Sequence, residues 1–381
     1  MKTRLLTLFV LLMSSAVFAQ QTISWDYDGT SRMYREYVPS NYDGNTAVPL
    51  VIALHGLGDN INNFSGVGFQ FVADTAGFIT VYPEALVDAL TGSTAWNSGA
   101  GLAGFSLNPT VDDVGFINAL IDTVSAHYNI DQSRVYATGF SMGGFMSNRL
   151  ACELNDRIAS IASVAGTVGG TLTCTPGTEI PVCHFHGTAD ATVGYGVSGG
   201  GVQDNTFGSN VDEWISYWSS NNSCGNVILE GQFPNTVNDG YIVDYLEYGG
   251  CTNDARVVHY KVHGAEHTWL PNQQSGADIF YVLEIWKFFL GVSPDNLVPS
   301  GIGETQISTV GVYPNPTSDV LRIENLEAKI SNVSVFNTTG QLVKEFTNVS
   351  TSVDVSDLPS GVYKIMVATE KGLYSNSFVK N

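Results

Sequence analysis

The segment around Ser141 has the residue types that nucleophilic chemistry needs. Residues 134–140 read as a short strand rich in β-branched and aromatic side chains, and small and apolar residues suited to a helix follow Ser141. Gly139 and Gly143 flank the serine in the pattern G-x-S-x-G, where bulky residues would clash with strand and helix. A serine on such a turn exposes its hydroxyl at a helix N-terminus, whose N–H groups stabilise developing negative charge. The sequence therefore predicts a hydrolytic serine at position 141.

A second match to the same short pattern surrounds Ser198. No strand leads into Ser198, and the residues that follow it are the Gly, Asp and Asn typical of loops. Because the chain contains 40 glycines, the pattern alone is weak, and its context has to decide. We interpret Ser198 as part of a surface loop.

A base and an acid follow two later apolar strands. Asp190 comes after the strand that ends at Phe185, and His267 comes after the strand 257–262. Open parallel sheets place their sites at the carboxyl ends of strands, and the order Ser, Asp, His is that of α/β-hydrolases. His267 would accept the proton of Ser141, and Asp190 would fix the tautomer of His267.

Other residues compete for these two roles. His263 is a rival base, but it lies nearer the strand and is expected to be a packed or hydrogen-bonded histidine. Asp204 and Asp212 are rival acids, and Asp190 itself would otherwise be read as a turn residue.

The oxyanion needs backbone donors. We expect the N–H of Met142, directly after the nucleophile, and the N–H of Leu57, in the glycine-containing loop 54–60. His55, in the same loop, is interpreted as structural. Trp96 and Trp269 are candidate apolar walls for an acyl group, although single tryptophans are commonly part of the core.

The elements that position these residues alternate between residues 21 and 290. The strands are apolar on both faces, which indicates a mostly parallel sheet covered by helices on both sides. The expected strands are 48–54, 78–82, 134–140, 158–164, 180–185 and 256–262, and the expected helices are 114–128, 142–154, 210–220 and 276–290.

Both ends of the chain differ from this pattern. Residues 1–19 carry basic residues, an apolar run and a small-residue cleavage pattern, as in a secretory signal peptide. The α/β domain that carries Ser141 is then expected over 20–292 and a Pro-, Ser-, Gly- and Asn-rich linker over 293–309. Period-two patterns over 310–381, with a turn at 337–340, predict a small all-β sandwich.

Charge and cysteines limit the partners and the compartment. The formal net charge of −20 disfavours binding to nucleic acid and to anionic membranes, and no later segment is apolar enough to span a bilayer.

The five cysteines lie in the exported part, where disulfides persist. No C-x-x-C occurs, so no metal or redox site is expected. Cys224 and Cys251 flank a loop-rich insertion and are the first expected pair, Cys152 and Cys174 are the second, and Cys183 is the expected free thiol.

These motifs resemble the polyhydroxybutyrate depolymerase and feruloyl esterase group of carbohydrate esterase family one, within the α/β-hydrolases. The likeness lies in His55-Gly56-Leu57-Gly58-Asp59, 111–117, Gly139–Gly144, His186-Gly187-Thr188-Ala189-Asp190 and His267-Thr268-Trp269. The resemblance implies Ser141, Asp190 and His267 as a catalytic triad, and a disulfide between Cys224 and Cys251. Ala265-Glu266 and Leu270-Pro271 depart from the group's usual residues around the histidine.

The tail is similar to the C-terminal sorting domain of type IX secretion. The likeness lies in 313–319, 360–365 and 378–380, and it implies recognition by secretion machinery and an extracellular or cell-surface location. The alternative, a carbohydrate-binding module, lacks an evident aromatic platform.

We expect a secreted serine ester hydrolase that uses an acyl-enzyme and no cofactor. Feruloyl or acetyl esters on plant polysaccharide are the leading substrates, and polyesters come next. A non-catalytic glycan-binding protein and a peptidase with the same triad are the other classes considered.

Overall fold

The structure of the chain, a computed structural model, has two compact units. The described residues are 20–102, 105–196, 208–270, 277–298, 308–324, 329–337, 342–347, 351–369 and 372–381. The units divide at Pro299 and Ser300, inside the expected linker, and each is described by itself. The expected signal peptide 1–19 and the residues Ser198 and Asp204 lie outside the described residues.

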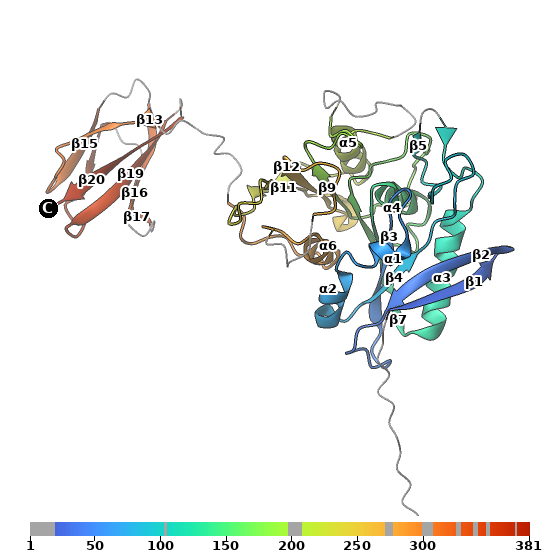
Figure 1. The fold of residues 1–381 in the computed structure, drawn as a ribbon. Helices are drawn as coiled ribbons and strands as arrows, with labels where there is room; N and C mark the ends of the chain where they lie inside the picture. Colours follow the sequence, from blue (N-terminus) through green and yellow to red (C-terminus); the bar gives the residue numbers. More distant parts are fainter. Residues whose placement is uncertain are drawn as a thin grey trace, which may run out of the picture. The chain divides into compact units, whose positions relative to one another are not determined.

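Unit 1 is built on a ten-stranded sheet with the order β1-β2-β4-β3-β7-β8-β9-β12-β11-β10 (Figure 1). The central strands from β4 to β12 pair in parallel, and the pairs at both edges are antiparallel. The strands are β1 (Gln21–Tyr27), β2 (Thr30–Tyr37), β3 (Val48–Leu54), β4 (Ile79–Pro83), β7 (Ile130–Phe140), β8 (Ser160–Val164), β9 (Val182–Gly187), β10 (Val227–Gln232), β11 (Ile242–Tyr248) and β12 (Val257–His263). A separate small hairpin joins β5 (Gly101–Leu102) and β6 (Phe105–Ser106).

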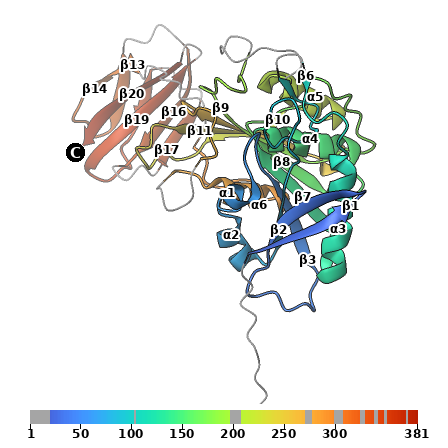
Figure 2. The same ribbon diagram turned by 45° about the vertical axis from the view of Figure 1, so that its right-hand side comes forward.

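Helices cover both faces of this sheet, as expected. One core contains residues of α3 (Asp113–His127), α4 (Met142–Glu153) and α5 (Val211–Asn221). The other contains residues of α1 (Ile61–Phe64), α2 (Phe69–Ala76) and α6 (Tyr281–Phe289). Alternate side chains of β3 enter the two cores, since successive residues of a strand point to opposite faces. Figures 1 and 2 show α2 and α6 side by side, away from α3. This is the α/β-hydrolase architecture predicted from the sequence.

Local sequence explains where the helices begin. Asp112 caps α3 by accepting a hydrogen bond of 2.9 Å from the N–H of Gly115. Asn210 and Glu213 form a capping box at the start of α5. The 3-10 turn η1 (Thr252–Asp254) leads into β12.

The edge strands differ from the sequence-based expectation. The segment between Cys224 and Cys251 was expected to be a loop-rich insertion, but it contains β10 and β11, which extend the sheet beyond β12. The helix expected from about residue 276 begins at Tyr281.

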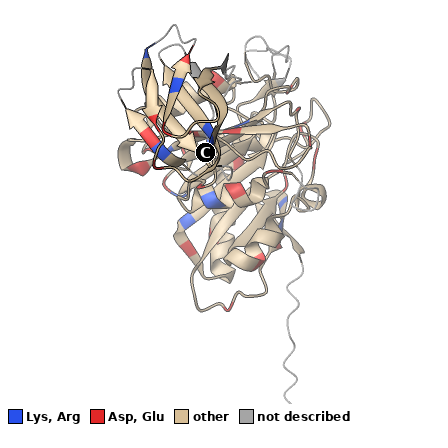
Figure 3. Cartoon of the chain, turned by 90° about the vertical axis from the view of Figure 1, so that its left-hand side faces the viewer, with Lys and Arg blue, Asp and Glu red and all other residues tan. Residues whose placement is uncertain are grey.

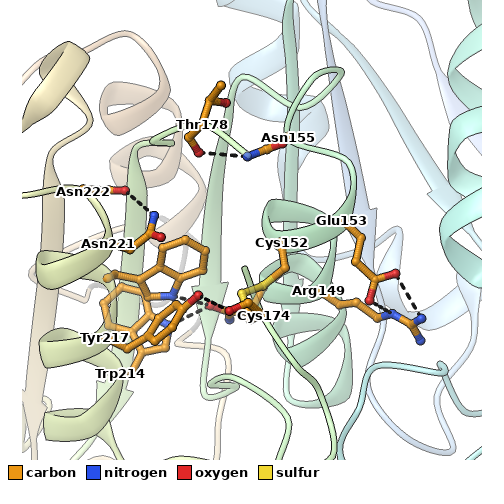
Figure 4. The surroundings of a disulfide bond; sticks show 12 residues. Arg149, Cys152, Glu153, Asn155, Cys174, Thr178, Trp214, Tyr217, Asn221 and Asn222 are labelled. Carbon is orange, nitrogen blue, oxygen red and sulfur yellow. Dashed lines mark hydrogen bonds and ion pairs between the residues drawn. A yellow bond between two sulfur atoms is a disulfide. The ribbon is translucent and has the colours of Figure 1, made fainter. Parts of the chain in front are cut away.

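Both expected disulfides form. Cys152 lies near the end of α4 and is joined to Cys174 in the loop before β9 (Figure 4). Cys224 is joined to Cys251. The same region is supported by the Tyr217 hydroxyl, which donates to the Cys174 carbonyl at 2.8 Å. Cys183 is the free cysteine and is buried in β9, as predicted.

Unit 2 is all-β, as the period-two pattern predicted. One sheet has the order β13-β20-β19-β16-β17 and the other β14-β15-β18. Apolar residues from both sheets, such as Leu321, Val333 and Ile365, form its core. The expected turn 337–340 lies largely outside the described residues. The strands are β13 (Ser308–Thr309), β14 (Gly311–Tyr313), β15 (Val320–Glu324), β16 (Ile330–Phe336), β17 (Leu342–Thr347), β18 (Ser352–Asp354), β19 (Gly361–Thr369) and β20 (Gly372–Lys380).

Charged residues are dispersed over the ribbon of the described residues (Figure 3). Acidic residues outnumber basic ones, 36 to 16. Among the described residues, no helix combines the length and the apolar character that crossing a bilayer requires.

Candidate active site

Ser141 lies on the tight turn between β7 and α4. Its φ of 53° and ψ of −119° are unusual for a residue with a side chain, which is the strain expected at a nucleophile elbow. A Cβ added at Gly143 would lie 2.0 Å from the Leu54 carbonyl oxygen, so no larger residue fits there. The N–H of Ser141 donates to the Val164 carbonyl at 2.8 Å and anchors the turn to β8.

The three residues predicted to act together are joined by two hydrogen bonds. Ser141 Oγ lies 2.8 Å from His267 Nε2, and His267 Nδ1 lies 2.8 Å from Asp190 Oδ2. Asp190 is 1% exposed and follows β9, while His267 is half-buried and follows β12. The sheet thus brings together three side chains that come after three different strands.

Asp190 is held as a carboxylate by several donors. Its Oδ1 accepts from the N–H groups of Thr192 and Val193, each at 2.8 Å. Burial by itself raises the pKa of Asp190, but the His186 and His267 side chains outweigh burial and hold that pKa below its usual value. An ionised Asp190 can therefore accept a hydrogen bond from the Nδ1–H of His267.

The rival residues that the structure describes, His263 and Asp212, lie elsewhere. His263 Nε2 lies 2.6 Å from Asp244 Oδ2 on the neighbouring strand β11, so its partner is not Ser141. Asp212 is exposed in the first turn of α5. These positions favour His267 and Asp190 for the roles proposed from the sequence.

The loop after β3 lies directly against Ser141. A Cβ added at Gly56 would lie 3.4 Å from Ser141 Cβ. Gly58 N–H donates to the Thr94 carbonyl at 2.9 Å, so the loop is tied down beyond Leu57. Met142 is the first residue of α4, and N–H groups of a first turn have no acceptor within their helix. Leu57 and Met142 both line the cavity beside Ser141. Their role as oxyanion donors remains a prediction.

Trp96 does not have the role expected from the sequence. It is fully buried, and its Nε1 donates to the His55 carbonyl at 2.9 Å. The expectation that Trp96 forms a wall for the acyl group is therefore wrong, because the indole packs beneath the loop rather than in the cavity. Trp96 instead holds the peptide that precedes Gly56.

His55 supports the same loop through its ring. Ala85 N–H donates to His55 Nε2 at 3.1 Å, so Nε2 is an acceptor and the proton is on Nδ1. Nδ1 donates to the Gly56 carbonyl at 2.8 Å. Burial lowers the pKa of His55, in keeping with a neutral ring. Because the C=O and N–H of a trans peptide point in opposite directions, this bond directs the Leu57 N–H away from His55.

Trp269 is half-buried near the catalytic histidine. Its ring lies 5.5 Å from Phe64, 6.0 Å from Tyr281 and 6.4 Å from Phe140, measured between ring centroids. Trp269 therefore belongs to an aromatic cluster that continues into the core. A contact between Trp269 and substrate remains a prediction.

The cavity beside Ser141 has a volume of about 450 Å³ and mostly apolar walls. Sequence reasoning overlooked several of its wall residues. Phe145 lies four residues after Ser141, one helical turn on, and this spacing was an available signal. The Phe140 ring packs 4.9 Å from the His267 ring. The lining residues are Gly56, Leu57, Asp59, Ala100, Leu107, Phe140, Ser141, Met142, Phe145, Thr192 and His267.

Comparison with protein families divides the chain as the fold does. Residues 41–200 match the family described as Phospholipase/Carboxylesterase, and residues 311–381 match the Secretion system C-terminal sorting domain. One part of the chain is therefore similar to esterase-type α/β-hydrolases, and a later part is similar to the sorting domain of a secretion system.

Individual relatives are esterases. The chain is 27% identical over 264 residues to the bifunctional acetylxylan esterase/xylanase XynS20E of Neocallimastix patriciarum, covering 68% of this chain and 33% of that protein. It is 29% identical over 284 residues to feruloyl esterase D of Neurospora crassa, covering 71% of this chain and 85% of that protein. It is 31% identical over 158 residues to poly(3-hydroxyalkanoate) depolymerase C of Paucimonas lemoignei, covering 40% of this chain and 36% of that protein.

A solved structure shows the same fold. The acetyl xylan esterase from Aspergillus awamori superposes with a TM-score of 0.51 at 16% identity, covering 71% of this chain and 99% of that one. At this identity the likeness concerns the fold alone. The chain spans about a third of the first relative named above, so the activity of that whole protein does not transfer with the match.

Proposed function

We propose that this chain, an esterase-type α/β-hydrolase domain joined to a secretion sorting domain, is a secreted serine carboxylic-ester hydrolase. The observation that carries the proposal is the continuous hydrogen-bonded row from Ser141 Oγ through His267 to Asp190 Oδ2. A buried carboxylate, an oriented imidazole and a strained serine are the parts that acyl transfer needs.

In the first half-reaction, Ser141 Oγ attacks the ester carbonyl while its proton passes to His267 Nε2, 2.8 Å away. The oxygen that becomes negative accepts hydrogen bonds from the Leu57 and Met142 N–H groups. His267 then gives its proton to the departing alcohol, and the C–O bond of the ester breaks. The products are an acyl-enzyme on Ser141 and the free alcohol.

In the second half-reaction, a water molecule takes the place of the alcohol. His267 accepts a proton from this water, whose oxygen attacks the acyl carbonyl. The proton returns to Ser141 Oγ as the bond between Ser141 and the acyl group breaks, so the acid leaves and the enzyme is restored. Asp190 remains a carboxylate throughout and stabilises the transient imidazolium. These steps use only side chains, backbone N–H groups and water.

Feruloyl esters on plant polysaccharide are the leading substrate, with acetyl esters as the smaller alternative. The cavity of about 450 Å³ falls within the range of about 300–1,000 Å³ typical of sites for small organic ligands. An acetyl group would leave most of this volume empty, whereas an aromatic acyl group would contact Phe145 and Leu107. Relatives that are feruloyl esterases and an acetylxylan esterase support the same class.

A polyester substrate is the second candidate. It is favoured by the match to the poly(3-hydroxyalkanoate) depolymerase and by the apolar character of the cavity. A non-catalytic glycan-binding role is disfavoured, because a binding protein has no use for a strained serine aligned with a histidine and a carboxylate.

The sorting domain supports an extracellular or cell-surface location. The partner of residues 311–381 is then the secretion machinery, and the ester substrate is met outside the cell.

Replacement of Ser141 by alanine tests the hydrolase proposal. We expect turnover of 4-nitrophenyl acetate to fall by at least about 10⁴-fold, with loss of labelling by a serine-directed phosphonate. Ser147→Ala is the matched control, since Ser147 is a buried serine of the same helix whose Oγ bonds the Gly143 carbonyl. Undiminished activity of folded Ser141→Ala would refute the proposal.

A substrate panel then separates the two ester classes. Methyl ferulate, acetylated xylan and polyester film are compared at equal enzyme concentration. Release from polyester without release of ferulate would reverse the ranking given above.

A further inference from the structure

A row of three buried side chains lies behind Asp190. Ser163 comes from β8, and His184 and His186 come from β9. Ser163 and His184 are fully buried, and His186 is 1% exposed. The steps described above do not use any of these three side chains.

Hydrogen bonds connect the row end to end. Ser163 Oγ lies 2.7 Å from His184 Nδ1, and His184 Nε2 lies 2.9 Å from His186 Nδ1. His186 Nε2 lies 2.8 Å from the Val193 carbonyl oxygen. The same Nε2 is 3.4 Å from Asp190 Oδ2, the oxygen that bonds His267.

The acceptors fix where the protons are. A carbonyl can only accept, so His186 Nε2 carries a proton. In a neutral His186 the Nδ1 atom then accepts the Nε2 proton of His184, whose Nδ1 in turn accepts the Ser163 hydroxyl. Burial lowers the pKa of His184 well below its usual value, which fits a neutral ring in this row. Each hydrogen bond of the row then has one direction, and the row ends with an N–H directed at the Val193 carbonyl, on a nitrogen that lies 3.4 Å from Asp190 Oδ2.

Val193 connects His186 to the carboxylate a second time. Its N–H donates to Asp190 Oδ1 at 2.8 Å, while its C=O accepts from His186. Removal of His186 would therefore release one of the two residues whose N–H groups hold Asp190 Oδ1, and would remove a ring nitrogen that lies 3.4 Å from Oδ2. Both effects allow the Asp190 carboxylate to rotate away from His267.

We propose that His186 is a positioning residue that orients the Asp190 carboxylate toward His267. The proposal rests on the hydrolase function proposed above. His186 lies too deep to touch substrate, so its effect must pass through Asp190 to the rate of the chemical step.

Two substitutions of His186 separate the contribution of its N–H donor from that of its aromatic ring. His186→Phe keeps the ring shape and removes both nitrogens, and we expect kcat for 4-nitrophenyl acetate to fall roughly 30- to 100-fold with KM changed less than about threefold. His186→Gln places an amide N–H near the position of Nε2, and we expect kcat within about fivefold of the unmodified protein. His259→Gln is the matched control, because His259 is equally buried and bonds Tyr195 rather than Asp190.

A double-mutant cycle with Asp190→Asn tests the route of the effect. Asp190→Asn alone is expected to lower kcat by roughly 10⁴-fold, as loss of the correct histidine tautomer does in serine hydrolases. If His186 acts through Asp190, adding His186→Phe to this variant lowers kcat by less than about threefold. Circular dichroism and thermal unfolding establish that each variant is folded.

The outcomes separate this inference from the function. Wild-type kcat in His186→Phe, or a full additional loss on top of Asp190→Asn, refutes the positioning role. Equal loss in His186→Phe and His259→Gln also refutes it, because it would reflect core damage. If Ser141→Ala keeps its activity, the proposed function itself is wrong. If Ser141→Ala is inactive while His186→Phe is normal, only the positioning role is wrong.

Discussion

Replacing Trp96 by phenylalanine tests whether the indole supports the oxyanion loop or contacts substrate. The substitution removes the Nε1 donor and leaves the His55 carbonyl without the hydrogen bond of 2.9 Å. His55 and the peptide that follows it then lose one of the bonds that hold the loop against Ser141. We expect lower stability and slower turnover, with unchanged selectivity among acyl groups.

The magnitude follows from the contacts of this side chain. A buried carbonyl left without a partner costs about 1–3 kcal/mol. The smaller ring leaves a cavity of roughly 40 Å³, which adds about 1 kcal/mol. The free energy of unfolding should therefore fall by about 2–4 kcal/mol, or roughly 4–8 °C in Tm for a domain of this size. A displaced rather than deleted oxyanion donor should lower kcat about tenfold, against 10²–10³ for complete loss.

The assay compares KM and kcat for methyl ferulate and 4-nitrophenyl acetate. A support role lowers kcat for both esters by the same factor and leaves the ratio of their KM values unchanged. Trp269→Phe is the control for stability, because the buried Trp269 Nε1 has no hydrogen-bond partner among the described residues. The reasoning would be refuted if KM for methyl ferulate rose tenfold while Tm and the turnover of 4-nitrophenyl acetate were unaffected. Trp96 would then contact the acyl group of the substrate.

Three other predictions follow from buried groups. Burial lowers the pKa of His259 from 6.5 to about 3 and also lowers that of His184, so the unfolded chain binds more protons than the folded one below about pH 6.5. The free energy of unfolding should therefore be highest above about pH 6.5 and should fall as the pH drops toward 3, by about 1.4 kcal/mol per pH unit for each histidine. In His259→Gln this dependence on pH should be weaker. A flat denaturant midpoint from pH 7 to 4 would contradict this. Replacing Cys224 and Cys251 together by serine should lower the free energy of unfolding, measured by urea denaturation, by about 3–4 kcal/mol, because the disulfide closes a loop of 27 residues. The kcat should be retained, because neither cysteine lines the cavity. Gly143→Ala should prevent the turn at Ser141 from forming, since the added carbon would lie 2.0 Å from a carbonyl oxygen of β3. Soluble and fully active Gly143→Ala protein would contradict this prediction, because it would show that the turn can adjust to a larger residue.

The convergence of the triad was predictable from sequence because each member follows an apolar strand. Parallel strands end at one edge of a sheet, so residues just beyond Phe140, Gly187 and His263 must lie near one another once the strands pair. The pairings β7 with β8, β8 with β9 and β9 with β12 supply this proximity. The roles of the residues could be proposed from their chemistry and their order in the chain.

The edge of the sheet was harder to predict. Residues 226–241 are rich in Gly, Asn, Asp and Pro, which masked the two strands between Cys224 and Cys251. Ile242–Tyr248 does alternate between exposed and buried positions, so a period-two signal was present and was outweighed by its neighbours.

The position of Trp96 had no local signal. Its neighbours are Gly, Ser, Thr and Asn, which suggest an exposed loop, and its partner His55 lies 41 residues away. The buried row behind Asp190 likewise depends on pairing between β8 and β9, which decides that Ser163 faces His184. Such contacts are properties of the assembled sheet rather than of any one segment.

The buried thiol of Cys183 bears on how the chain acquires its disulfides. An exported chain with five cysteines can form wrong pairs while it is unfolded, and a thiol reacts only as an accessible thiolate. Once β9 is in the sheet, burial both shields Cys183 and raises its pKa. Mispairing is thereby confined to the interval before the central strands assemble, so oxidative maturation of this protein should depend on the sheet closing faster than its cysteines are oxidised.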